Sequence, residues 1–196
     1  MSSNSGVAMN AITMSVRRMA VVGAAALGLA VAGGAQANLV TNGSFETGDF
    51  AGWTQSGDTS FTGVSCGVVA PQGNCLAFFG PLQPGGIAQN LATQANGNYV
   101  VTFSFASDGG TPSSFAARFG GQTLTSQTNT PAGAFQNLRF LVSASSANTN
   151  LNFTFVNQSG FSFLDAVAVE APEPASLALL GLGLGALALM RRRQQR

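Results

Sequence analysis

Apolar side chains recur at every second position in several short stretches of the chain, namely residues 99–105, 138–142 and 151–155. Because successive side chains of a strand point to opposite faces, this period of two predicts half-buried β-strands. Residues 163–169 repeat the pattern with Phe163, Val167 and Val169 on one face. Turn-forming pairs rich in Gly and Asn separate the stretches. Strands at roughly 8–12-residue intervals predict an antiparallel β-sandwich or barrel without internal helices.

The N-terminal end carries a different pattern, which predicts a secretory signal peptide over residues 1–37. Arg17 and Arg18 precede an uninterrupted apolar run over residues 20–32, and Ala35-Gln36-Ala37 fits a small-x-small cleavage site. The alternative is a transmembrane helix, but the 13-residue run is short of the roughly 20 residues that span a bilayer. We therefore expect export through the Sec machinery.

The C-terminal end, residues 172–196, predicts a membrane anchor. Pro172-Glu173-Pro174 is followed by an apolar stretch over residues 175–190, which as a single helix would reach about 24 Å and so span a bilayer marginally. A basic cluster closes the chain, made of Arg191, Arg192, Arg193 and Arg196. Cationic residues stay on the cytoplasmic side and stop translocation. The alternative, a buried core helix, leaves this cluster unexplained. Residues 38–171 are then the exported domain.

The composition of that domain excludes much chemistry. The chain has no His and no Lys, so it lacks the side chains required for His-ligated metals, Ser-His-Asp or Cys-His catalysis, Schiff-base lysines and Walker-type phosphate loops. Residues 38–171 contain two cationic residues, Arg118 and Arg139, and six acidic residues, which gives a formal charge of −4. This balance argues against a nucleic-acid partner, which needs clustered cations.

Cys66 and Cys75 are the two cysteines of the chain. In an exported protein they predict a disulfide across a short loop. A metal site would need further ligands and a catalytic thiol would need a base, and no His is present to serve as either.

The C-terminal sequence Pro-Glu-Pro-Ala-Ser-Leu-Ala-Leu-Leu-Gly-Leu-Gly, followed by the basic cluster, resembles the PEP-CTERM sorting signal of Gram-negative bacteria. The resemblance covers Pro172 to Arg196. It implies recognition at the Pro-Glu-Pro motif by an exosortase, a membrane Cys protease/transpeptidase, and removal of the helix. That family is associated with exopolysaccharide and biofilm matrix production. The expected course is an inner-membrane precursor that later reaches the cell surface or the extracellular space.

The segment Asn38 to Thr54, with its Asn-Gly-Ser-Phe-Glu and Gly-Trp-Thr motifs, resembles the opening of jelly-roll domains of the carbohydrate-binding-module type. Residues 87–91, 98–105 and 163–169 continue the resemblance. It implies an all-β, antiparallel jelly-roll sandwich. It also implies a structural Ca²⁺ where the first and last strands meet, with Glu46 and Asp165 at the positions of its acidic ligands. The alternative is that Glu46 caps a turn while Asp165 pairs with Arg118 or Arg139.

Trp53 and Tyr99 are the sole Trp and Tyr of the chain, and sugar-binding faces usually stack sugar rings on such aromatics. Tyr99 shares a strand face with Val101 and Phe103, and Trp53 is expected to pack under the sandwich, so the core is favoured for both. Ligand-binding residues are therefore left open.

Three functions remain. The favoured hypothesis is an exported structural or adhesive protein of the cell surface or matrix, without catalysis and without a required cofactor. The second is a carbohydrate-binding module for an exopolysaccharide. The third is a two-carboxylate glycoside hydrolase, which would need no His, although no motif groups two of the seven acids.

Overall fold

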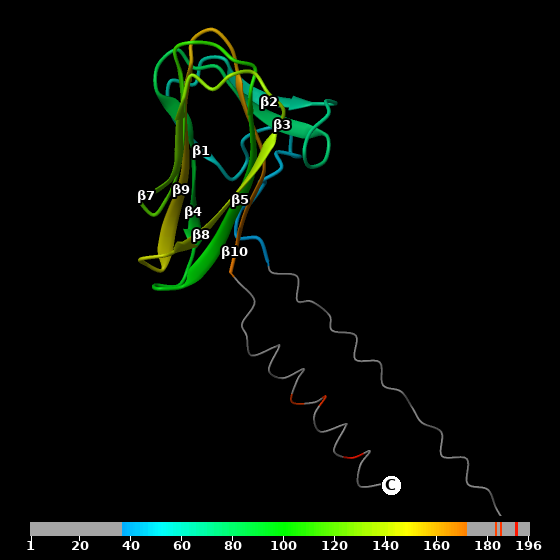
Figure 1. Cartoon of the computed structure of the whole chain (residues 1–196), viewed down its shortest axis with the longest axis vertical. Coiled ribbons are helices and arrows are strands. Elements are labelled where there is room, and N and C mark those ends of the chain that lie inside the picture. The colour runs from blue at the N-terminus through cyan, green and yellow to red at the C-terminus, as the bar shows by residue number, and fades with distance from the viewer. Residues whose placement is uncertain (1–36, 172–182, 184, 186–190, 192–196) are drawn as a thin grey trace, which may run out of the picture. The chain divides into compact units, whose positions relative to one another are not determined.

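The computed structural model describes residues 37–171 and the isolated positions 183, 185 and 191. Residues 54–170 contain ten strands joined by loops (Figure 1). They are β1 (Thr54–Gly57), β2 (Thr62–Cys66), β3 (Cys75–Phe79), β4 (Gly85–Ala92), β5 (Asn98–Ser107), β6 (Ser113–Phe119), β7 (Gln122–Thr128), β8 (Gln136–Ser143), β9 (Asn148–Asn157) and β10 (Ser162–Glu170). No helix occurs within residues 37–171.

The strands form two five-stranded antiparallel sheets. The first sheet has the order β1-β4-β9-β6-β7 and the second has the order β2-β3-β10-β5-β8. This is the all-β jelly-roll sandwich that the sequence predicts. The alternating stretches that the sequence reveals all lie in strands: residues 99–105 in β5, 138–142 in β8, 151–155 in β9 and 163–169 in β10.

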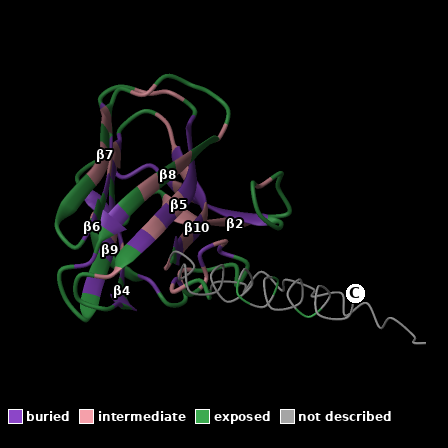
Figure 2. Ribbon diagram, turned by 60° about the horizontal axis from the view of Figure 1, so that its bottom comes forward, coloured by how far each residue is buried: buried purple, intermediate pink, exposed green. Residues whose placement is uncertain are grey.

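The core lies between the sheets and is made largely of phenylalanine. Along β9 and its neighbours, buried and exposed residues alternate (Figure 2), as expected for sheets with one solvent-facing side. Two stacked pairs join the sheets, Phe79 with Phe155 and Phe105 with Phe115, each with ring centroids 3.9 Å apart. Trp53 and Tyr99 are 8% and 4% exposed, so both belong to this core.

Two strand pairs depart from regular pairing. In the first sheet, the register of β6 with β7 shifts between Ala117 and Arg118. The register of β10 with β5 shifts between Asp165 and Ala168, and Ala166 has a φ of 52°. Such a β-bulge leaves extra residues on one strand and bends it. By contrast, β4 and β9 pair without a break from Gly85↔Phe155 to Ala92↔Asn148.

Most of the two predicted terminal segments lies outside the described residues. Of the predicted membrane helix over residues 175–190, the structure describes only Gly183 and Gly185, which are helical. Of the predicted signal peptide it describes only Ala37. Among all described positions, no helix has the length and apolar character needed to cross a bilayer.

Candidate functional site

The outer side of the first sheet is an open polar surface. On β4, β9 and β6, every second residue is buried in the core and its neighbours point outward. Most of the outward residues carry a hydroxyl or amide group, and we call their surface the amide face. Its members are Thr54, Ser56, Ala88, Asn90, Ser114, Ala116, Arg118, Thr123, Ser126, Asn150, Asn152, Thr154 and Val156, with the buried Gly86 in the same rows.

The strand register aligns these residues into rows that cross the sheet. One row runs through Ala88, Asn152, Arg118 and Thr123, which are successive partners on β4, β9, β6 and β7. The adjacent row runs through Gly86, Thr154, Ala116 and Ser126. Directly opposed residues have Cβ atoms about 5 Å apart. The face is thus a regular array of amide, hydroxyl and methyl groups.

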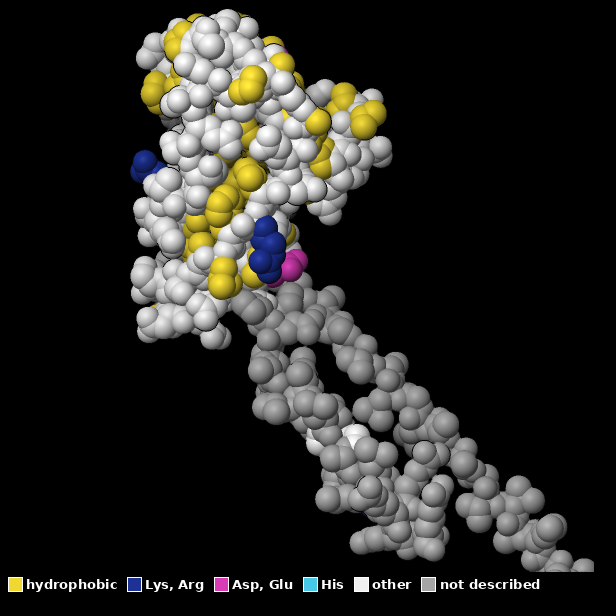
Figure 3. Space-filling model, viewed as in Figure 1, with side chains coloured by type: hydrophobic (Ala, Val, Ile, Leu, Met, Phe, Trp, Pro, Cys, Tyr) yellow, Lys and Arg dark blue, Asp and Glu magenta, His cyan; other side chains and the backbone are white. Residues whose placement is uncertain are grey.

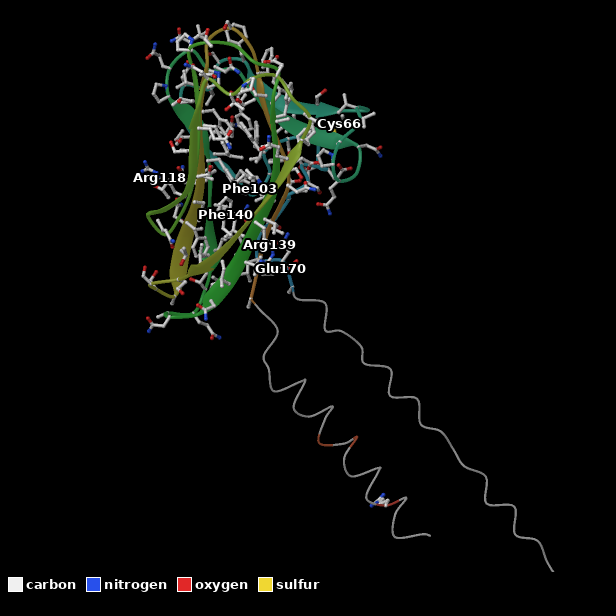
Figure 4. The ribbon with its side chains drawn as sticks, in the orientation of Figure 1. Cys66, Phe103, Arg118, Arg139, Phe140 and Glu170 are labelled. Carbon is white, nitrogen blue, oxygen red and sulfur yellow. A yellow bond between two sulfur atoms is a disulfide. The ribbon has the colours of Figure 1, made fainter. Side chains whose placement is uncertain are left out.

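Two details shape this face. The Asn150 side chain donates from Nδ2 to Oδ1 of Asn90 at 2.8 Å, which holds two amides in a cross-strand pair. Gly86 lies where a Cβ would collide with the backbone carbonyl oxygen of Phe153, so no side chain rises at this point. Arg118 is the one charged side chain among the residues of the amide face, and it points away from the sandwich (Figure 4).

The outer side of the second sheet is partly covered by the β2–β3 loop, residues 67–74. The disulfide Cys66–Cys75 closes the base of this loop, with a Cα–Cα distance of 4.0 Å; Figure 4 labels Cys66 there. The bond confirms the pairing predicted from the sequence. Inside the loop, Gly67 N donates to Asn74 O at 2.9 Å. The loop is therefore a tied hairpin.

Glu46 and Asp165, the predicted calcium ligands, both bind this loop. Glu46 Oε1 accepts hydrogen bonds from the N–H groups of Asn74 at 3.0 Å and Cys75 at 2.8 Å. Asp165 Oδ2 accepts from Gln72 N at 2.8 Å, while its Oδ1 accepts from Ala166 N at 2.6 Å. Glu46 thus caps a turn. Asp165 is held by backbone N–H groups, and in the described structure no arginine bonds to it.

Asp165 has a raised pKa. Burial raises the pKa of Asp165 to about 6, against the lowering effect of its two backbone hydrogen bonds, and the negative charge of Glu46 raises it further. Among the described residues, no cluster of three or more acidic or sulfur side chains could hold a metal. A cation at this position would have the oxygens of two carboxylates as its side-chain ligands, donors of the hard type that Ca²⁺ prefers.

Other acids of the domain stabilise loops. Asp49 Oδ1 accepts hydrogen bonds from Thr47 Oγ1 and Ala51 N, which lower its pKa. Asp58 accepts from Ser60 N and Gln83 N, and hydrogen bonds from Ser60 and Gln83 lower its pKa to about 2. Both are ionised at neutral pH, so neither can act as the proton donor that a glycoside hydrolase needs.

Comparisons with known proteins agree with both parts of this description. Residues 170–194 match the PEP-CTERM protein-sorting motif, which indicates an exported protein with a membrane-anchored precursor in a Gram-negative bacterium. No curated protein matches the chain at a significant level. Carbohydrate-binding modules are among the solved structures that resemble it.

One is TmCBM61 in complex with β-1,4-galactotriose, with a TM-score of 0.58 and 20% identity over 69% of this chain and 99% of that one. A second is a xylan-binding domain from carbohydrate-binding module family 22, with a TM-score of 0.53 and 14% identity over 70% and 97%. A third is a xylanase 10B fragment of Clostridium thermocellum with xylohexaose, with a TM-score of 0.53 and 13% identity over 69% and 29%. At these identities the likeness establishes the jelly-roll fold.

Sequence reasoning found the carboxylates and the disulfide but missed the amide face. A local signal for it exists in β9, where Asn150 and Asn152 alternate with Leu151 and Phe153. The rows themselves join residues of four or five strands, and no local pattern reveals that registration. In the sequence, Trp53 and Tyr99 were the aromatic residues that could be considered as sugar platforms. In the structure both are buried, and the aromatic side chains that reach the surface are phenylalanines.

Proposed function

We propose that the chain is an exported protein of the cell surface or extracellular matrix that binds a polysaccharide through its amide face and carries out no chemical step. An exosortase is the expected processing partner. The observation that carries this proposal is the in-register array of amides and hydroxyls on the first sheet. The structural or adhesive role follows from holding polysaccharide chains rather than from changing them.

The chemistry of the array suits a polysaccharide. Each sugar hydroxyl can donate and accept, and so can each Asn side chain, which has two N–H donors and an acceptor oxygen. Asn150, Asn152 and Thr154 succeed one another on β9 at every second residue, about 7 Å apart. The methyl groups of Ala88 and Ala116 lie in the same rows and can contact the apolar faces of sugar rings. A regular array fits a repeating ligand.

The carboxylates give no support to the glycoside hydrolase alternative. Glycosidases need one carboxylic acid that stays protonated beside the glycosidic oxygen and a second carboxylate facing the same bond. Asp165, whose pKa is raised, is 0% exposed and lies under the β2–β3 loop. The acids with lowered pKa values, Asp49 and Asp58, are bound into separate turns.

The binding test uses the exported protein purified from its native host and the exopolysaccharide of the same host. Co-sedimentation compares the unaltered protein with an Asn152→Ala/Thr154→Ala variant. Loss of two hydrogen-bonding side chains predicts affinity lower by about tenfold or more. Gln83→Ala, an exposed amide in the loop before β4, is the matched control and keeps the original affinity. Equal sedimentation of all three proteins would refute the amide face as the binding surface.

The sorting step has its own test. We expect the mature protein to end near Pro172 and to lack residues 175–190, because Pro172-Glu173-Pro174 lies within the matched sorting motif and marks the point at which an exosortase would act. Mass spectrometry of the C-terminal peptide from surface or medium protein reads this out directly. Glu173→Ala leaves the precursor in the inner membrane, and Glu170→Ala, outside the motif triplet, does not. Finding residues 177–190 attached to protein in the medium contradicts the sorting proposal.

The proposal includes a structural Ca²⁺ ion held by Glu46 and Asp165. It is supported by the hydrogen bonds of both carboxylates to the same β2–β3 segment, where a dication would relieve the repulsion between them. Addition of Ca²⁺ should then raise the melting temperature of the purified protein, and a chelator should reverse the change. Glu46→Gln removes the effect. An unchanged melting temperature in saturating Ca²⁺ argues for a metal-free loop.

A further inference from the structure

The outer side of the second sheet contains clefts that nothing in the proposed function uses. A cleft of about 550 Å³ lies between loop residues 69–72 and the β5–β8 pair. A cleft of about 390 Å³ shares Ser104, Asn137 and Ala166 with it and extends to Thr102 and Arg139. We call this joined space the groove.

The ring of Phe135, which precedes β8, lines one end of the groove. Its centroid is 6.5 Å from that of Phe163 on β10, which lies opposite Phe78 on β3. Phe78 and Phe163 line a separate apolar cleft of about 420 Å³, so an aromatic row continues from the groove into that cleft. All three rings are only half-buried, so part of each ring remains open to a ligand.

A polar row follows the aromatic row along the strands. Asp165, Ser104 and Asn137 are successive partners on β10, β5 and β8. Ser104 is 3% exposed, and its hydroxyl donates to Asn137 Oδ1 at 2.6 Å. This bond fixes the Asn137 amide and leaves its Nδ2 without a partner among the described residues. A buried hydroxyl that orients an exposed amide is a feature of a built site.

The spacing of these rows matches a sugar ring. Neighbouring rows are two residues apart along a strand, about 7 Å. A pyranose stacked on the aromatic row would therefore place its hydroxyl edge at the polar row. The next row, with Thr102 and Arg139, lies another two residues along. From Phe135 to Arg139 the groove spans about 13 Å, which is room for a short oligosaccharide and not for a long chain.

Local charge favours an uncharged ligand. Arg139 lies beside Glu170 at the open end of the groove (Figures 3 and 4), and Asp165 is covered by the loop and bound by backbone N–H groups. The groove therefore presents the Phe135 ring and the Asn137 amide along its length, and charged side chains of both signs lie toward one end, so no single sign of charge selects an acidic or a basic sugar.

We infer that the groove is a second glycan-binding site, specific for a short neutral oligosaccharide such as a chain end or branch. The inference rests on the proposed function only for the class of ligand. Because the two sheets face opposite ways, one domain would hold a chain on the amide face and a chain end in the groove. Such a protein cross-links the polysaccharide rather than coating it.

The test titrates the exported protein, purified from its native host, with short oligosaccharides made by partial hydrolysis of that host's exopolysaccharide. Calorimetry compares the unaltered protein with Phe135→Leu, Asn137→Ala and Phe135→Tyr. We expect about five- to tenfold weaker binding when the ring or the amide is removed, and near-normal binding for Phe135→Tyr, which keeps the ring. The amide-face variant Asn152→Ala/Thr154→Ala should bind these oligosaccharides normally.

Each other outcome overturns the inference without deciding the proposed function. If Asn152→Ala/Thr154→Ala weakens oligosaccharide binding while Phe135→Leu and Asn137→Ala do not, the amide face is the single site. If no oligosaccharide binds, or if all variants bind alike, the groove is not a glycan site. Co-sedimentation with intact polysaccharide remains the separate measure of the amide face. Thermal unfolding of each variant verifies that it is folded.

Discussion

The two outer faces of this sandwich are built from the same kinds of strand but differ in regularity. On the first sheet, eight successive residues of β4 pair with β9 without interruption, and the one register shift lies between β6 and β7; the result is an array of rows. On the second sheet, the bulge in β10 and the tied β2–β3 loop interrupt the surface, and the result is a groove. Long unbroken pairing favours a repeating ligand, whereas a loop folded over a sheet creates a local cleft.

The polar groups of the two faces are also fixed differently. Asn150 and Asn90 bond to each other in the open, exposed to water. The side-chain oxygen of Asn137 accepts a hydrogen bond from the buried Ser104 hydroxyl, which holds the amide in place. The amide face can therefore adjust to its ligand, while the groove is preorganised, which reduces the entropic cost of binding.

The largest expected effect on stability comes from adding a side chain at Gly86, within the rows of the amide face. In Gly86→Ala, the new methyl group meets the backbone carbonyl of Phe153, so β4 and β9 must separate. We expect a loss of about 3 kcal/mol or more in the free energy of unfolding, measured by urea denaturation. Ala88→Ser, two residues away on the same face, is the control and changes stability by less than about 1 kcal/mol. A fully stable Gly86→Ala protein would show that the two strands can adjust.

The second prediction tests whether the two binding surfaces are independent, by removing the disulfide of the β2–β3 loop. Replacing both cysteines with serine, Cys66→Ser/Cys75→Ser, removes a tie across a sequence separation of 9, which costs about 2–3 kcal/mol. Because residues 69–72 form one wall of the groove, oligosaccharide binding should weaken while co-sedimentation with polysaccharide is retained. Denaturation and calorimetry on the same samples test both statements. Loss of polysaccharide binding with intact folding would contradict the separation.

The sequence predicted the strands and the fold because the core repeats at a period of two in β5, β8, β9 and β10. It also predicted the disulfide, because export leaves few other uses for two cysteines. The bulge at Ala166 escaped prediction because its positive φ occurs at a residue that gives no Gly or Asn signal.

The two binding surfaces were beyond local sequence patterns for different reasons. The amide face depends on the register of separate strands, such as Asn152 beside Arg118, which is set by tertiary pairing. The aromatic row was hidden by composition, because in the sequence Phe135 and Phe163 look no different from the phenylalanines that fill the core, among the 15 of the chain. Glu46 and Asp165 were found by resemblance, and spacing alone would not have joined residues from the two ends of the domain.

The third prediction concerns the pH dependence of the loop that walls the groove. The folded-state pKa of Asp165, about 6, lies above the usual 3.8, so the folded state holds the extra proton and stability falls as pH rises from about 4 to 6. The fall should be about 1–2 kcal/mol. Glu46→Gln removes the negative charge that helps to raise the pKa of Asp165, so the fall in stability should become smaller. Denaturation at several pH values in a chelator tests this, and a flat profile in the unaltered protein argues against it.

The smallest effects compare one substitution on both faces. Asn137→Ala deprives the buried Ser104 hydroxyl of its acceptor, and an unsatisfied buried group costs about 1 kcal/mol or more. Asn150→Ala breaks the bond to Asn90, but both positions are exposed and water replaces the lost partner, so about 0.5 kcal/mol is expected. Urea denaturation of the two variants in parallel resolves this order. If Asn150→Ala proves the more costly, the amide pair contributes to holding β4 and β9 together, and the amide face is the more rigid of the two surfaces.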